Sequence, residues 1–60
     1  MRTRQAANLR KGNEIVIDGV PVTVERVDDV TEAVDLTVRG PRGRSHVIED
    51  VDRDQPFPLH

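Results

Sequence analysis

The residues best suited to bind another molecule are three arginines that surround a glycine-rich turn. Arg39, Arg42 and Arg44 lie in the segment RGPRGR, where glycine and proline separate the charged positions. A loop of this composition can follow a phosphate backbone, which predicts nucleic-acid contact there, supported by the arginines of residues 1–8. The alternative is a solvated hairpin tip, balanced by nearby Asp and Glu side chains.

Two features of the composition oppose nucleic-acid binding. The formal net charge is −2, so the chain as a whole is not attracted to a polyanion. It also contains neither Trp nor Tyr, and so lacks the usual side chains on which bases stack. We therefore keep the arginine loop as the alternative and favour a protein partner.

Other residue patterns that could do chemistry are incomplete. The alternating acids from Asp50 to Asp54 resemble the start of a calcium-binding loop, but Gln55 replaces the required glycine. Ser45 and His46 are adjacent, yet nothing else in the sequence suggests a catalytic pocket around them. We expect no enzyme activity, no catalytic residues, no bound metal and no cofactor.

The strongest structural signal is a β-hairpin from Asn13 to Val27. Asp18-Gly19 separates two runs of alternating apolar residues, as in a two-residue hairpin turn. This turn predicts the pairs Ile17–Val20, Ile15–Val22 and Asn13–Val24, with the apolar side chains on one face.

The opposite face of this hairpin is only half polar. Val16, Pro21 and Thr23 lie on it, and we predict that they contact a protein partner. An edge strand also offers free backbone groups to the strand of a partner.

The remaining chain predicts more short strands. The apolar positions change parity after Val24, which predicts a bulge near Glu25-Arg26. A polar connection over 28–32 precedes a strand over 33–39, a turn over 40–43, a strand over 44–49 with Val47 or Ile48 inward, and a closing tail over 50–60. We expect an all-β, SH3-like barrel of four to five short antiparallel strands over 9–60, preceded by an N-terminal arm over 1–8.

The size of the chain sets limits on its stability and location. Sixty residues without cysteine support one small core, and self-association as a two-fold dimer would add stability. No apolar run approaches the roughly 20 residues of a membrane span. We expect a soluble, cytoplasmic protein with no membrane contact.

Residues 9–27, LRKGNEIVIDGVPVTVERV, resemble the opening of the N-terminal KOW-like barrel of elongation factor P. The matching positions are Leu9, Gly12, Ile15, Asp18, Gly19, Pro21, Val24 and Glu25. The family carries a glycine-flanked Lys or Arg at the tip of the next hairpin, which acts at the ribosomal centre. Here the corresponding segment, 28–32, is acidic and contains neither Lys nor Gly. The resemblance thus implies the barrel but not the activity of the translation factor.

Together these observations predict a non-enzymatic binding module. Protein–protein interaction is the favoured function, for example in an accessory protein of a phage or mobile element. The alternative is a nucleic-acid- or ribosome-associated module that uses residues 39–44.

Overall fold

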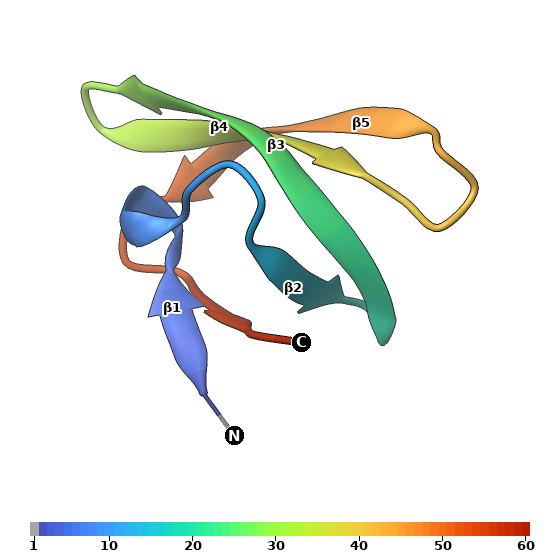
Figure 1. Ribbon diagram of the computed structural model, residues 1–60. Helices are drawn as coiled ribbons and strands as arrows, with labels where there is room; N and C mark the ends of the chain where they lie inside the picture. The colour runs from blue at the N-terminus through green and yellow to red at the C-terminus, as the bar shows by residue number, and fades with distance from the viewer. Residues whose placement is uncertain (1) are drawn as a thin grey trace.

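The structure is a computed structural model that describes residues 2–60. Two antiparallel sheets make up most of this part of the chain (Figure 1). The larger sheet has the order β2 (Glu14–Ile17), β3 (Val20–Val30), β4 (Ala33–Arg39) and β5 (Ser45–Asp52). The smaller sheet pairs β1 (Thr3–Gln5) with β6 (Pro56–Pro58), and one 3-10 turn, η1 (Ala6–Asn8), follows β1. This all-β architecture is the small SH3-like barrel that the sequence predicts.

The first hairpin has the predicted register. Ile17 pairs with Val20 and Ile15 with Val22, around a turn in which Asp18 and Gly19 have φ angles of 51° and 79°. Ile15 is fully buried, whereas Val20 beside the turn is 43% exposed. The apolar face is therefore buried most fully at the end far from the turn, while Ile17 beside the turn still packs against the core.

Replacing Gly19 by valine is expected to destabilise the domain. A Cβ at this position would meet no atom within 4 Å, so the cost lies in the positive φ alone. A side chain in this region costs about 1–2 kcal/mol, or roughly 4–16 °C in the melting temperature of so small a domain. Thermal unfolding followed by circular dichroism measures the shift.

The matched control for this prediction is Gly40→Ala. Its φ lies outside the left-handed region, and its Cβ would only touch the carbonyl oxygen of Arg44 at 3.8 Å. The control should melt close to the unmodified protein. Equal melting temperatures for Gly19→Val and the unmodified chain would contradict the turn argument.

The predicted bulge is present in β3. Val24 pairs with Val38 and Arg26 with Thr37, so Glu25 is the extra residue. A bulge bends its strand and increases the local twist. The two halves of β3 can therefore pair with β2 on one side and β4 on the other, which curls the sheet into a barrel (Figure 1).

Two of the predicted boundaries are wrong. The polar connection over 28–32 is largely strand, because Val30 pairs with Ala33 and only Thr31-Glu32 form the turn. The solvent-facing pair Asp28–Asp35 is tolerated there, since Arg26 Nε lies 2.9 Å from a carboxylate oxygen of Asp28.

The strand expected over 44–49 continues to Asp52 in β5. It contains a second bulge, in which Asp50 has a φ of 57° and donates its N–H to Asp35 Oδ1 at 3.1 Å. Of the two candidates for the inward position, Ile48 is half-buried, whereas Val47 is exposed. The bulge then restores an inward direction at Val51, which is buried.

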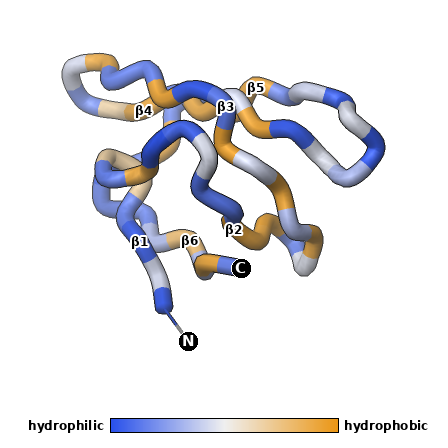
Figure 2. The backbone as a smooth tube through the Cα atoms, in the orientation of Figure 1, coloured by the Kyte–Doolittle hydropathy of each residue, from blue (hydrophilic) through white to orange (hydrophobic). Residues whose placement is uncertain are grey.

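The two ends of the chain close the barrel. Leu59 forms a bridge with Ile15, and the N–H groups of Ala6 and Ala7 donate to the carbonyls of Gln55 and Arg53. Hydrophilic and hydrophobic positions alternate along the long strands (Figure 2), and the apolar ones meet in one core. The buried core residues are Ala6, Leu9, Ile15, Val22, Val24, Val34, Leu36, Val38 and Val51. The division into an arm over 1–8 and a domain over 9–60 stays a prediction.

Candidate nucleic-acid interface

The three predicted arginines lie together at one end of the large sheet. Arg39 ends β4, and Arg42 and Arg44 lie in the turn that leads to β5. The Gly40 N–H donates to the Arg44 carbonyl at 2.9 Å, and the Gly43 N–H donates to the Gly40 carbonyl at 3.0 Å. These two bonds give the turn a defined shape, with all three arginine side chains exposed.

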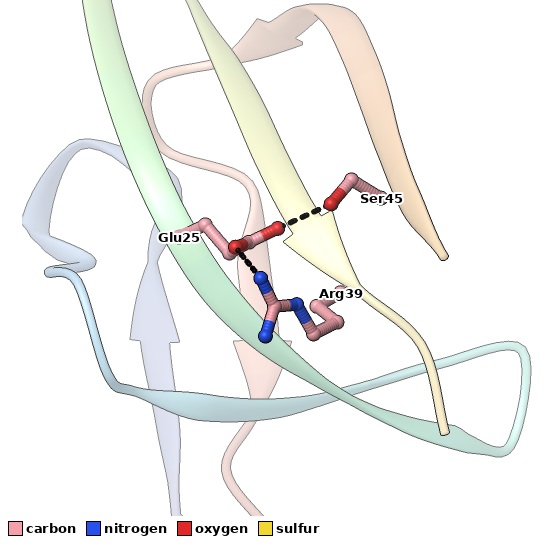
Figure 3. A network of polar contacts seen from close by, with 3 residues as sticks. All are labelled: Glu25, Arg39 and Ser45. Carbon is pink, nitrogen blue, oxygen red and sulfur yellow. Dashed lines mark hydrogen bonds and ion pairs between the residues drawn. The ribbon is translucent and has the colours of Figure 1, made fainter. Parts of the chain in front are cut away.

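Glu25 connects β3, β4 and β5 at this end of the sheet (Figure 3). Arg39 Nη2 donates to Glu25 Oε2 at 2.8 Å, and Ser45 Oγ donates to Glu25 Oε1 at 2.6 Å. From the bulge in β3, the Glu25 carboxylate reaches both Arg39 at the end of β4 and Ser45 at the start of β5. The carboxylate thereby positions the Arg39 guanidinium, which still has an exposed side-chain fraction of 56%.

Lys11 joins the arginines from a distant part of the sequence. The Gly12 N–H donates to the Val24 carbonyl at 2.8 Å, which holds the connection before β2 against β3. Lys11 and Arg39 line one shallow hollow of about 240 Å³, together with Gly12, Thr23, Val24 and Glu25. The segments that carry Lys11, Glu25, Arg39 and Arg44 thus follow one another across the sheet.

We call the four cations of this end the basic row: Lys11, Arg39, Arg42 and Arg44. Lys11, Arg42 and Arg44 form no ion pair within residues 2–60. Lys11 was not among the residues predicted for this site. The signal was present, because the predicted pairing of Asn13 with Val24 extends to Gly12 opposite Glu25, which brings the neighbouring Lys11 to this end of β3.

The acidic residues gather at the other end of the same strands. The β3–β4 turn and the β4–β5 turn lie at opposite ends of the sheet (Figure 1). Arg26 and Arg53 pair with Asp28 and Asp29 at the acidic end, so its cations are already engaged. The acids on its strands and turn are Asp28, Asp29, Glu32, Asp35, Glu49, Asp50 and Asp52. The net charge of −2 therefore conceals a strong separation of charge.

The residues predicted to contact a protein lie on the outer face of the first hairpin. Val16 and Pro21 are paired directly, with Pro21 exposed and Val16 half-buried. Thr23 is one step further along this face and lines the hollow beside Lys11. The structure thus brings Val16 and Pro21 together and places Thr23 at the border of the basic row.

The other residues considered for chemistry form no larger constellation. His46 is exposed on β5, and the Ser45 hydroxyl is bonded to Glu25 rather than to His46. Within residues 2–60, no group of three His, Cys, Asp or Glu side chains is arranged to hold a metal ion. No helix in this part of the chain is long and apolar enough to cross a membrane.

Comparisons with known proteins support the fold. No family model matches the chain, and no curated protein matches it. Among solved structures, the chain is similar to a translation initiation factor eIF-5A family protein from Naegleria fowleri, with a TM-score of 0.75 and 22% sequence identity. The match covers 97% of this chain and 45% of that one, so this chain spans less than half of that protein's length.

The similarity confirms the small β-barrel. At this level of identity it shows the fold alone, and the specific likeness to elongation factor P stays a prediction. The segment expected to correspond to the functional tip of the elongation factor P family is the end of the β3–β4 hairpin, where Thr31 and Glu32 form the turn.

Proposed function

We propose that this domain is a non-enzymatic RNA-binding module that holds the phosphate backbone on the basic row. Lys11, Arg39, Arg42 and Arg44 would contact phosphates, and Glu25 would orient Arg39. The row crosses four neighbouring segments, a width of about 14 Å at the usual strand spacing, which is enough to follow several phosphates. Bases would remain unread, because phosphate contacts carry no sequence information.

The observation that carries this proposal is the separation of charge along the sheet. The negative net charge opposed nucleic-acid binding only while the charges were treated as evenly spread. Within residues 2–60 the acids of the β3–β4 end have Arg26 and Arg53 as ion-pair partners, while most of the basic row is unpaired. A local positive surface attracts a polyanion whatever the total charge.

We propose RNA rather than DNA by analogy with the structural neighbour, which is named as a member of a translation initiation factor family. The aromatic content agrees with backbone binding, because the single Phe, Phe57, is partly buried and packs against the core. This proposal reverses the preference drawn from composition.

The proposal predicts salt-sensitive binding of RNA. Four phosphate contacts on a single strand correspond to a slope of about −2.8 in a plot of log K against log salt, or about 50-fold weaker binding at 200 mM than at 50 mM salt. Fluorescence anisotropy with a labelled single-stranded RNA and with a labelled RNA duplex measures this slope. Unrelated sequences of equal length should bind equally well.

Two results would overturn the RNA proposal. One is the absence of binding at 50 mM salt with tens of micromolar protein. The other is binding that does not change with salt, because contacts to phosphate necessarily release counterions. A duplex of DNA in the same assay tests the preference for RNA.

A second candidate function is protein binding through the first hairpin. The observation in its favour is the Val16–Pro21 pair, which places two apolar side chains together on the outer face of the sheet. The Val16→Lys variant separates the two functions. It would disrupt a protein complex formed there, but it removes none of the basic row and should not weaken RNA binding.

A further inference from the structure

One long strand of the barrel has an open edge. β5 is the last strand of the large sheet and pairs only with β4 among the described strands (Figure 1). The Arg44 carbonyl accepts a hydrogen bond from the Gly40 N–H, so the backbone groups of Arg44 point toward β4. His46 and Ile48, which pair with Val38 and Leu36, point their backbone groups toward β4 in the same way. Successive residues of an antiparallel strand point their backbone groups in opposite directions. Ser45, Val47 and Glu49 therefore direct their N–H and C=O groups away from β4.

The side chains do not protect this edge strongly. Ser45–Asp52 contains neither Pro nor Lys, which are common defences against edge-to-edge pairing. Val47 has an exposed fraction of 61%, the highest among the exposed large hydrophobic residues. The bulge at Asp50 ends the straight part of the strand, so the segment open to pairing is short, from Ser45 to Glu49.

The charges along β5 indicate what can pair with this edge. The strand follows the cation Arg44 and ends in the acids Glu49, Asp50 and Asp52. In an antiparallel pair of two such strands, the basic beginning of each lies beside the acidic end of the other. A parallel pair would place like charges together, which is unfavourable. The edge is therefore complementary to itself in the antiparallel direction.

We propose that β5 pairs antiparallel with β5 of a second copy of this chain, around a two-fold axis at Val47. When a two-fold axis joins two sheets edge to edge in the antiparallel direction, the outer faces of both sheets lie on the same side of the combined sheet. The two Val47 side chains therefore meet on the outer face. Ser45 then lies opposite the second copy's Glu49, and Arg44 beside its Asp50. The backbone groups of 45, 47 and 49 all find partners in this register.

This inference does not rest on the proposed RNA binding, although Arg44 takes part in both, and its test leaves all four residues of the basic row unchanged. The chain contains no cysteine, so a single introduced cysteine can form a disulfide only with the same position of a second copy. In the proposed register the two Cα atoms at position 47 lie about 5.5 Å apart, within the range that a disulfide spans. The two residues at position 45 are four residues out of register, about 13 Å apart along the strands.

The experiment compares Val47→Cys with Ser45→Cys under mild oxidation. Both positions lie on the same strand and face and are exposed, which makes Ser45→Cys a matched control. We expect Val47→Cys to form a disulfide-linked dimer at least tenfold faster, as measured on non-reducing gels. Equal rates for the two variants, or no cross-linking at position 47, would overturn the proposed register.

Sedimentation equilibrium of cysteine-free protein provides the second measurement. Val47→Pro removes a donor that points away from β4, so it removes no hydrogen bond within the barrel. We expect dimers of the unmodified protein and of Val47→Thr at high micromolar concentration, and a monomer for Val47→Pro. A monomeric unmodified protein under these conditions would refute the dimer, and equal association of all three proteins would exclude β5 as its interface.

Discussion

Replacing Leu36 by alanine is expected to leave most of the protein unfolded at 25 °C. Leu36 is fully buried at the centre of β4 and is one of the largest completely enclosed side chains, with Ile15, Val24 and Val34. Leu→Ala at such a site costs about 2–5 kcal/mol, and a domain of this size is rarely more stable than about 3–5 kcal/mol. Circular dichroism and the dispersion of amide proton resonances measure the folded fraction.

Val30→Ala is the control for this prediction. Val30 also lies in a strand of the large sheet, but it is 51% exposed. Its replacement should change the free energy of unfolding by less than about 1 kcal/mol, as is usual for surface positions. If Leu36→Ala melted within a few degrees of the unmodified chain, the core described here would be incorrect.

The parts of the fold that could be predicted depend on contacts between neighbouring strands. The Asp18-Gly19 turn and the alternation around it determine the register of β2 and β3, and the change of parity after Val24 reveals the bulge at Glu25. Each of these signals is contained within a few residues of sequence. The local pattern was therefore sufficient to predict the first hairpin and the bend in β3.

The incorrect boundaries lie where the local pattern is overridden by tertiary contacts. Asp28 and Asp29 resemble a loop by composition, yet ion pairs with Arg26 and Arg53 support them in β3. The bulge at Asp50 depends on a hydrogen bond to Asp35 on the neighbouring strand. The Arg53–Asp29 ion pair and the Asp50–Asp35 hydrogen bond join residues that are 24 and 15 positions apart, so the composition of either segment alone could not reveal them.

The candidate site was predicted in part for the same reason. The arginines of 39–44 are close in sequence and were recognised, whereas Lys11 enters the basic row only through the pairing of its segment with Val24. The separation of acids from bases is likewise a property of the sheet. The net charge is a sum over both ends of the sheet, so it cannot reveal this separation.

Replacing Arg39, Arg42 and Arg44 by serine is expected to weaken RNA binding by more than about tenfold at 50 mM salt. Only Lys11 of the basic row would remain, so the slope of log K against log salt should fall from about −2.8 to about −0.7. The fold should persist, because all three side chains are exposed and Glu25 keeps its bond to Ser45. Anisotropy at several salt concentrations and a thermal melt of the same sample test both expectations.

The control variant replaces Arg2, Arg26 and Arg53 by serine. Both triple variants change the formal net charge from −2 to −5, but only the first removes charge from the basic row. Arg26 and Arg53 form exposed ion pairs, whose loss costs at most about 1 kcal/mol each. If RNA binds at the basic row, binding is lost in the Arg39/Arg42/Arg44 variant and largely retained in the control variant. Equal losses would mean that total charge alone drives association, and unchanged binding in both would direct attention to the Val16–Pro21 face.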